Sequence, residues 1–178
     1  MNFETLSQWR RAAYCAAMAS RNSNHVLLFS DMLEQDAAPF TKLQNKTWAF
    51  LEGELQSVDN LERFFNEFDL WQTDLLKEQD SFGAEAAQQA CQSLYSAAYA
   101  LLDDSANDCE LVQLSNQQLF TEMADMGSET DELTQRHDEF EQQVLDTLTS
   151  GKPKRECILA VRKLATNEDE SSLGITLI

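Results

Sequence analysis

Few residues of this sequence have the types and spacing that metal or acid–base chemistry requires. His137 and Glu141, in the stretch "HDEFE", stand four positions apart, which places both on one face of a helix where a metal ion could use them. A metal site normally takes three or four protein ligands, and this stretch supplies two. We therefore interpret it as part of a solvated acidic helix face. The sequence predicts no metal and no cofactor.

The two histidines also exclude a di-iron centre. Such centres in helical bundles use Glu-x-x-His on two helices. The residues three positions before His25 and His137 are Asn22 and Thr134, so neither histidine belongs to that motif.

The sequence offers no nucleophile with an evident base and no glycine-rich phosphate loop. It contains no GxSxG, Walker A or GxGxxG pattern. Cys15, Cys91, Cys109 and Cys157 are scattered singly, with no CxxC pair and no short disulfide framework. We expect all four to be reduced and buried, and we predict no catalytic residue.

Acidic side chains dominate the charge. The net charge is −18, and the segment 52–150 holds 23 of the 31 acids but 3 of the 13 bases. Such a surface repels nucleic acid and anionic lipid, so neither is expected as a partner. The acids serve either solubility alone or contact with a partner protein, which we expect to be basic or multivalent. A third alternative, mimicry of nucleic acid, requires carboxylates in two regularly spaced lines.

The opening residues favour a soluble cytoplasmic protein. "MNFETLSQWRR" places charges where a secretory signal would be apolar. The longest run of small and apolar residues nearby, "AAYCAAMA", is far shorter than the roughly 20 residues that cross a bilayer.

Any functional side chain must therefore be positioned by helices. The chain has 5 glycines and 2 prolines, few for a fold with many turns. Apolar residues recur at three- and four-residue spacing, which predicts an all-α bundle of about seven to eight helices. The expected helices cover about 3–21, 25–35, 39–55, 57–76, 80–102, 105–126, 128–149 and 153–165.

Several helix ends are expected at particular residues. Ser57 with Asn60, Ser105 with Asp108 and Ser128 with Asp131 have the three-residue spacing of N-terminal caps. Pro153 is expected to begin the last helix, and Gly151 to follow the end of the one before.

We predict one domain over 1–178, with helices in 1–170 and an extended tail over 171–178. In this tail, "SSLGITLI", apolar Leu173, Ile175 and Leu177 alternate with their neighbours, a period that suits an extended strand. The tail either docks onto its own domain, which we favour, or pairs with the tail of a second copy. The protein is accordingly expected to be a monomer or a homodimer.

Several segments together resemble the YjaG-like family, a bacterial family of all-helical proteins of unknown function. "LSQWRRAAYCAAMASR" is similar to its opening Leu-x-x-Trp helix, and "LLFSDM" to its second helix. "DSFGAEAAQQAC" resembles its Asp-x-Tyr-Gly-Val-Tyr-Pro-Ala-x-Asp-Ala-Cys motif, and "SSLGI" its closing Ser-Asn-Ile-Gly-Ile. The positions that match the family are Trp9, Arg21, Gly83, Ala87, Ala90, Cys91 and Gly174.

The departures from the family motif argue against an enzyme. Phe82 replaces the Tyr before Gly, Ala86 replaces the Pro, and Gln89 stands where an Asp usually precedes Ala-Cys. If that Asp were a catalytic acid or base, this chain would lack it. The resemblance therefore implies the fold and no activity.

The leading functional hypothesis is a non-enzymatic interaction or structural protein. The alternative is a small-molecule binding protein or enzyme, with a pocket near the helix that starts at Gly83 and is lined by Cys91, Tyr95 and Trp9. Under the leading hypothesis we expect Cys91 to be buried and unreactive and Trp9 to belong to the core.

Overall fold

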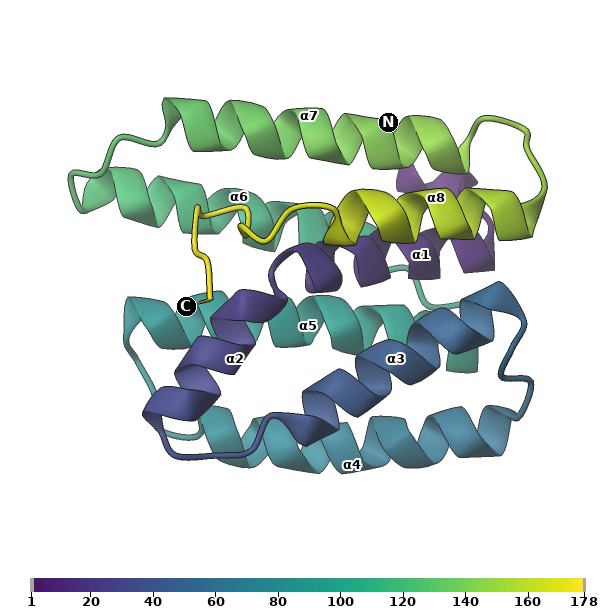
Figure 1. The fold of residues 1–178 in the computed structure, drawn as a ribbon, viewed down its shortest axis with the longest axis horizontal. Coiled ribbons are helices and arrows are strands. Elements are labelled where there is room, and N and C mark those ends of the chain that lie inside the picture. Colours follow the sequence, from purple (N-terminus) through teal and green to yellow (C-terminus); the bar gives the residue numbers. More distant parts are fainter. Residues whose placement is uncertain (1, 178) are drawn as a thin grey trace.

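Eight α-helices follow one short 3-10 turn, Phe3–Thr5, in the computed structural model, which describes residues 2–177 (Figure 1). The helices are α1 (Gln8–Arg21), α2 (Ser23–Met32), α3 (Ala38–Glu52), α4 (Val58–Leu76), α5 (Phe82–Leu102), α6 (Cys109–Asp125), α7 (Asp131–Leu148) and α8 (Lys154–Thr166). Within the described residues there is no β-strand, and the one isolated bridge joins Glu170 to Thr176. The predicted all-α bundle is confirmed.

Helices α1 and α5 form the centre of the bundle. They pack on each other. Helix α1 also contacts α3, α6, α7 and α8. Helix α5 also contacts α2, α3, α4 and α6. Alanines line much of both helices, among them the fully buried Ala13 and Ala17 of α1 and Ala97 of α5. Small side chains let two helix backbones approach closely, which explains why the alanine-rich helices occupy the middle.

Two apolar clusters flank this central pair. One joins α1 to α7 and α8 and includes Trp48, Leu148 and Ile158. The other lies between α2, α3, α4 and α5, where Phe68 packs beside Phe40 with ring centroids 6.1 Å apart. The aromatic residues of α4 therefore face the core.

The predicted helix starts are partly correct. Ser57 caps α4, since its side chain accepts a hydrogen bond from the Asn60 backbone N–H. The predicted starts at Ser105 and Ser128 are wrong, because α6 begins at Cys109 and α7 at Asp131. Both serines instead lie in local turns. The hydroxyl and the backbone N–H of Ser105 donate to the Asp103 carboxylate. The Ser128 N–H donates to the carbonyl of Met123, just after α6 ends.

The last helix and the tail follow the expected order with one change. Pro153 lies at the N-cap of α8, and Gly151 follows α7 with a positive φ of 83°. Beyond α8 the tail runs back over the bundle (yellow in Figure 1). Its alternating pattern is interrupted by a turn, closed by a hydrogen bond from the Gly174 N–H to the Ser171 carbonyl (3.0 Å). Ile178 lies outside the described residues.

No helix between residues 2 and 177 combines the length and apolar character that a membrane crossing needs.

Candidate functional site

The most extensive buried polar cluster lies where α1 meets α2, and it holds the C-terminal tail. Asn22, fully buried, occupies the single position between these helices. Its side-chain oxygen accepts hydrogen bonds from the backbone N–H (3.1 Å) and the hydroxyl (2.6 Å) of Ser172. Its amide nitrogen donates to Gln89 of α5 (3.2 Å) and Asn116 of α6 (3.0 Å). One side chain thus joins α5, α6 and the tail.

A histidine and a serine form the second part of this cluster. The Ser171 hydroxyl oxygen accepts from the backbone N–H groups of Leu173 (3.3 Å) and Ile175 (3.1 Å). Both lone pairs are then used, so the hydroxyl proton is donated to His25 Nε2, 2.8 Å away. Burial lowers the pKa of His25 to about 4, although the Ala86 carbonyl opposes the shift. His25 is therefore a neutral acceptor near neutral pH.

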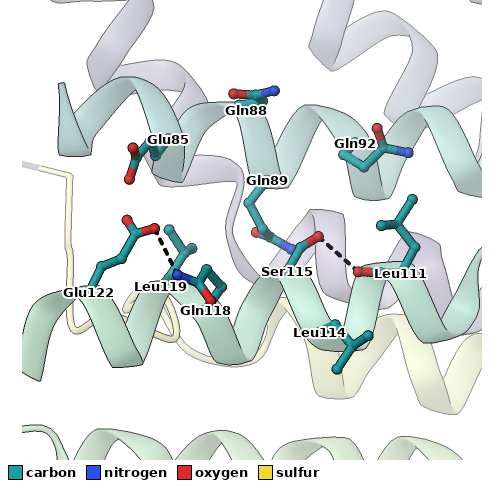
Figure 2. Close-up of a pocket in the computed structure, with 10 residues that line it drawn as sticks. All are labelled: Glu85, Gln88, Gln89, Gln92, Leu111, Leu114, Ser115, Gln118, Leu119 and Glu122. Atoms are coloured by element: carbon teal, nitrogen blue, oxygen red, sulfur yellow. Dashed lines mark hydrogen bonds between the residues drawn. The ribbon is translucent and has the colours of Figure 1, made fainter. Parts of the chain in front are cut away.

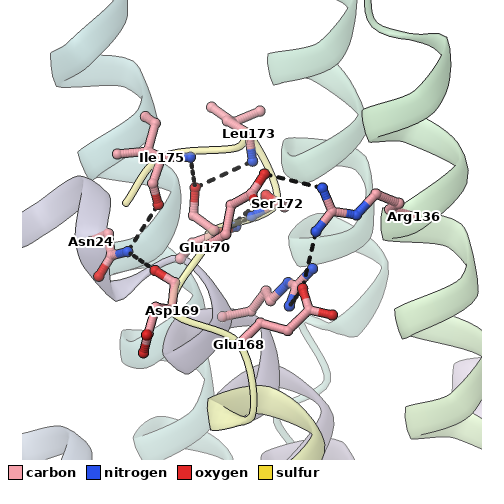
Figure 3. Close-up of polar contacts among 11 residues, drawn as sticks. Asn24, Arg136, Glu168, Asp169, Glu170, Ser172, Leu173 and Ile175 are labelled. Atoms are coloured by element: carbon pink, nitrogen blue, oxygen red, sulfur yellow. Dashed lines mark hydrogen bonds and ion pairs between the residues drawn. The ribbon is translucent and has the colours of Figure 1, made fainter. Parts of the chain in front are cut away.

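Ion pairs cover the outside of the cluster (Figure 3). Glu168 binds Arg21 (3.1 Å) and Arg136 (3.0 Å), while Glu170 binds Arg136 (3.0 Å). The positive charge of Arg21 is the main reason that the pKa of Glu168 is lowered. The side-chain amide of Asn24 adds hydrogen bonds to the backbone carbonyls of Asp169 (2.8 Å) and Ile175 (2.9 Å).

We call Asn22, Asn24, His25, Ser171 and Ser172 the tail clamp. Several of its hydrogen bonds, and the ion pairs beside it, join the helical body to the tail. The clamp therefore fixes the tail on its own domain, which is the alternative we favoured from the sequence. These contacts stabilise the position of the tail on the helices.

A second candidate site is an open groove between α5 and α6, with a cavity volume of about 460 Å³ (Figure 2). We call it the α5–α6 groove. It is lined by Glu85, Gln88, Gln89, Gln92, Leu111, Leu114, Ser115, Gln118, Leu119 and Glu122. The lining contains two carboxylates, several neutral polar side chains and three leucines, but no lysine or arginine.

The two carboxylates of this groove point toward each other from facing helices (Figure 2). A hydrogen bond with Glu122 is the main reason that the pKa of the Glu85 carboxyl is raised. Glu122 also accepts a hydrogen bond from the side chain of Gln118 (3.1 Å). Two carboxylates placed in this way favour a shared proton or a cation between them.

The stretch considered for metal binding has a different role. His137 is 2% exposed and packs beside the ring of Phe120, so it does not lie on a solvated face as we expected. Glu141 accepts hydrogen bonds from the Tyr14 hydroxyl (2.6 Å) and the Gln113 amide (3.0 Å). Among the described residues, no three His, Cys, Asp or Glu side chains gather as metal ligands would.

All four cysteines are buried and free, as expected. Cys91 is fully buried in α5, and desolvation raises the pKa of its thiol. Cys15 and Cys109 lie beside each other with their sulfur atoms 3.9 Å apart, and the pKa of Cys15 is raised by hydrogen bonding to Cys109 and by burial. A raised pKa keeps the thiols of Cys15 and Cys91 protonated and poorly nucleophilic.

The pocket expected near Gly83 does not have the lining we predicted. Cys91 and Tyr95 belong to the cluster between α2 and α5, whereas Trp9 packs on the other cluster. None of the five best-formed cavities among residues 2–177 has Cys91, Tyr95 or Trp9 in its lining. Trp9 therefore does not join Cys91 and Tyr95 in one apolar cluster.

Trp9 lies at the edge of the core and not inside it. It is half-buried, with the Arg10 guanidinium 4.3 Å and the Lys154 ammonium 6.0 Å from its ring centroid. The indole ring thus packs against the core on one side and carries two cations near the other.

A family comparison gives the chain its place among known proteins. A model for the DUF416 family, described as proteins of unknown function, matches residues 1–176. The chain belongs to the DUF416 family. Membership in a family of unknown function, expected from the sequence, is confirmed. No curated protein matches the chain significantly.

A crystal structure of a DUF416 family protein from Shewanella baltica OS155 has a TM-score of 0.80 to this chain. The two share 16% sequence identity, and the match covers 98% of this chain and 96% of that one. At this identity, the likeness shows a common fold.

In this DUF416 protein, the seven positions taken from the resemblance fall into three places. Ala87, Ala90 and Cys91 are buried in α5, and Gly83 is exposed in its first turn. Arg21 and Gly174 each lie next to the tail clamp: Arg21 precedes Asn22 and binds Glu168, and the Gly174 N–H donates to the Ser171 carbonyl. Trp9 stands apart from both.

Sequence reasoning missed the most connected polar residues of this family member. No local motif marks Asn22 as a core residue, although its side chain joins α5, α6 and the tail. Glu85 and Glu122 lie in different helices, so no local motif joins them. Gln89 stands where the family pattern has Asp. An amide at this otherwise apolar helix position is the one sequence feature that indicates the buried amides of Asn22, Gln89 and Asn116.

Proposed function

We propose that this protein is a non-enzymatic interaction or structural protein of the cytoplasm, whose strongly acidic exterior contacts a basic partner protein. The observation that carries the proposal is that few carboxylates of the segment 52–150 form an ion pair with a lysine or arginine of the same chain. Most carboxylates of this segment are exposed. Among the described residues, Glu52 and Glu54 are the acids of the segment that form ion pairs with a base. Apart from those held by internal hydrogen bonds, such as Glu141, the other carboxylates are left to interact with solvent or a partner.

The arrangement of the polar groups supports a role without catalysis. The asparagines and serines of the tail clamp and the Tyr14–Glu141 pair make their hydrogen bonds within the protein. The four buried, free thiols are in keeping with a reducing cytoplasm. We also infer that the DUF416 chain is YjaG-like, on the strength of the motifs that it shares with that group.

Retention of lysate proteins on the immobilised protein tests the proposal. Basic proteins should be retained at about 50 mM salt and released at about 500 mM, because screening removes attraction between exposed charges. A variant neutralised across the segment, with Asp74→Asn, Glu85→Gln, Glu122→Gln, Asp138→Asn and Glu139→Gln, should retain less. If neither protein retains anything at low salt, the acids serve solubility alone.

A second candidate function rests on one observation. The raised pKa of Glu85, in a groove beside the helix that starts near Gly83, is the property expected of a general acid. Under this alternative the α5–α6 groove binds a small molecule. Thermal-shift screening with small metabolites tests it: a ligand that stabilises the wild type but not a Glu85→Gln variant would favour the alternative.

A further inference from the structure

We propose that the α5–α6 groove is the docking site for a basic amphipathic helix of a partner protein. This inference rests on the proposed function and gives it a place on the molecule. The occupant is defined by chemistry: a lysine or arginine at one end of the helix and apolar side chains along the same face.

Charge identifies the first contact. Glu85 and Glu122 face each other at one end of the groove (Figure 2), and no described base forms an ion pair with either. The groove lining itself contains no lysine or arginine. A cationic side chain between the two carboxylates would turn their repulsion into attraction, and an arginine could bind both through its forked donors.

Exposed leucines identify the second contact. Leu111 and Leu114 line the groove and are 48% and 54% exposed. They stand three positions apart on α6, the spacing at which two side chains occupy neighbouring places on a helix. Covering them with an apolar surface would contribute favourably, at about 25 cal/mol per Å² removed from water.

The distance between the two contacts sets the size of the partner. Leu111 and Glu122 are separated by 11 positions of one α-helix, so the groove extends about 16 Å along α6. A partner helix of about three turns therefore reaches from the leucines to the carboxylates. Between them lie the neutral amides of Gln88, Gln92 and Gln118, which can be covered without burying a charge.

Binding of a synthetic helical peptide tests the inference. The peptide has leucines spaced three and four residues apart and two lysines at one end, and its affinity is measured by fluorescence anisotropy at low salt. The double variant Glu85→Gln and Glu122→Gln should bind about five- to tenfold more weakly than the wild type. Leu114→Ser should also weaken binding. A peptide with glutamines in place of lysines should lose most of its affinity.

A matched control separates the groove from the general surface. Asp138→Asn with Glu139→Gln removes the same charge from exposed positions of α7. We expect this pair to change peptide affinity less than twofold. Since all four substituted acids lie at the surface, circular dichroism should show unchanged helicity in both double variants.

Three results would overturn the inference. If the α7 variant weakens binding as much as the groove variant, attraction is diffuse and the groove is not the site, while the proposed function stands. If lysate proteins are retained but the peptide does not bind the wild type, the groove inference alone is wrong. If light scattering shows a dimer that Glu85→Gln with Glu122→Gln dissolves, the occupant is a second copy.

Discussion

A few buried polar side chains bring together parts of the chain that are distant in sequence. Asn22 lies 150 positions before its partner Ser172 and 94 before Asn116. An unpaired buried amide is costly, so each partner restricts where the others can lie. The residues of the tail clamp thereby select one position of the tail over the many that an apolar surface alone would accept.

Substitution of Gly174 should destabilise the protein for two separable reasons. Its φ of 79° is unfavourable for a residue with a side chain, and an added Cβ would lie 3.2 Å from the Glu170 carboxylate and 3.4 Å from Leu133. We expect Gly174→Ala to lower the free energy of unfolding by about 2 kcal/mol, measured by urea denaturation.

Gly53→Ala is the matched control, because Gly53 has a φ of 83° and open space around its Cβ position. It should cost about 1 kcal/mol, the backbone contribution alone. Equal losses in the two variants would show that the contacts around Gly174 do not restrict the tail.

Acid should destabilise the protein through His25. Its pKa in the folded protein is about 4, below the ordinary value of 6.5, so the unfolded chain binds the proton first as pH falls. Stability is then lost between about pH 6.5 and pH 4, by about 2 kcal/mol from neutral pH to about pH 5. Urea denaturation across this range measures it.

The variant His25→Gln keeps an acceptor for the Ser171 hydroxyl but cannot titrate. We expect it to have a shallower loss of stability over the same range than the wild type. The second buried histidine, His137, also has a pKa lowered by burial, so His137→Gln should reduce the slope as well. An unchanged slope in His25→Gln would contradict the role of His25.

At the scale of elements, the helices were predictable because their apolar spacing repeats over several turns. The first residues of the helices were less predictable. Ser105 and Ser128 have the sequence spacing of N-terminal helix caps, but hydrogen bonds with Asp103 and Met123 hold them in turns. The tail was recognised as a non-helical element. Its turn depends on Gly174 and on contacts with distant helices, which a local pattern does not contain.

Removal of Leu173 to Ile178 should lower the melting temperature at every protein concentration. The deletion takes away a buried leucine and the hydrogen bond from the Asn24 amide to the Ile175 carbonyl. We expect a loss of about 3 kcal/mol, or about 6–12 °C by calorimetry. Leu173→Ala is the milder companion and should lose about half as much. Unchanged melting together with loss of a dimer would assign the tail to a subunit contact.

At the scale of the whole molecule, charge is the property that the sequence predicts most directly. A net charge of −18 repels itself within a compact fold. We expect the melting temperature to rise by several degrees between about 20 and 500 mM sodium chloride, because salt screens this repulsion. Sucrose of equal osmolality is the control. A melting temperature that falls with salt would mean that the ion pairs around Glu168 outweigh the repulsion.

The candidate sites were less accessible from sequence than the fold. The absence of a nucleophile motif and the burial of Cys91 followed from residue types and helical spacing. The α5–α6 groove did not, since Glu85 and Glu122 face each other only because two helices pack side by side. Asn22 was hidden for the same reason: its partners come from α5, α6 and the tail.

The tail clamp also sets an order of events during synthesis. The partners of Asn22 and His25 in the tail are made about 150 residues later, which at about 5–20 residues per second is a delay of about 8–30 s. Until then the nascent helices keep these polar groups hydrated and the clamp incomplete. A chain released before the tail is made would therefore leave His25 and the side-chain oxygen of Asn22 without their partners Ser171 and Ser172.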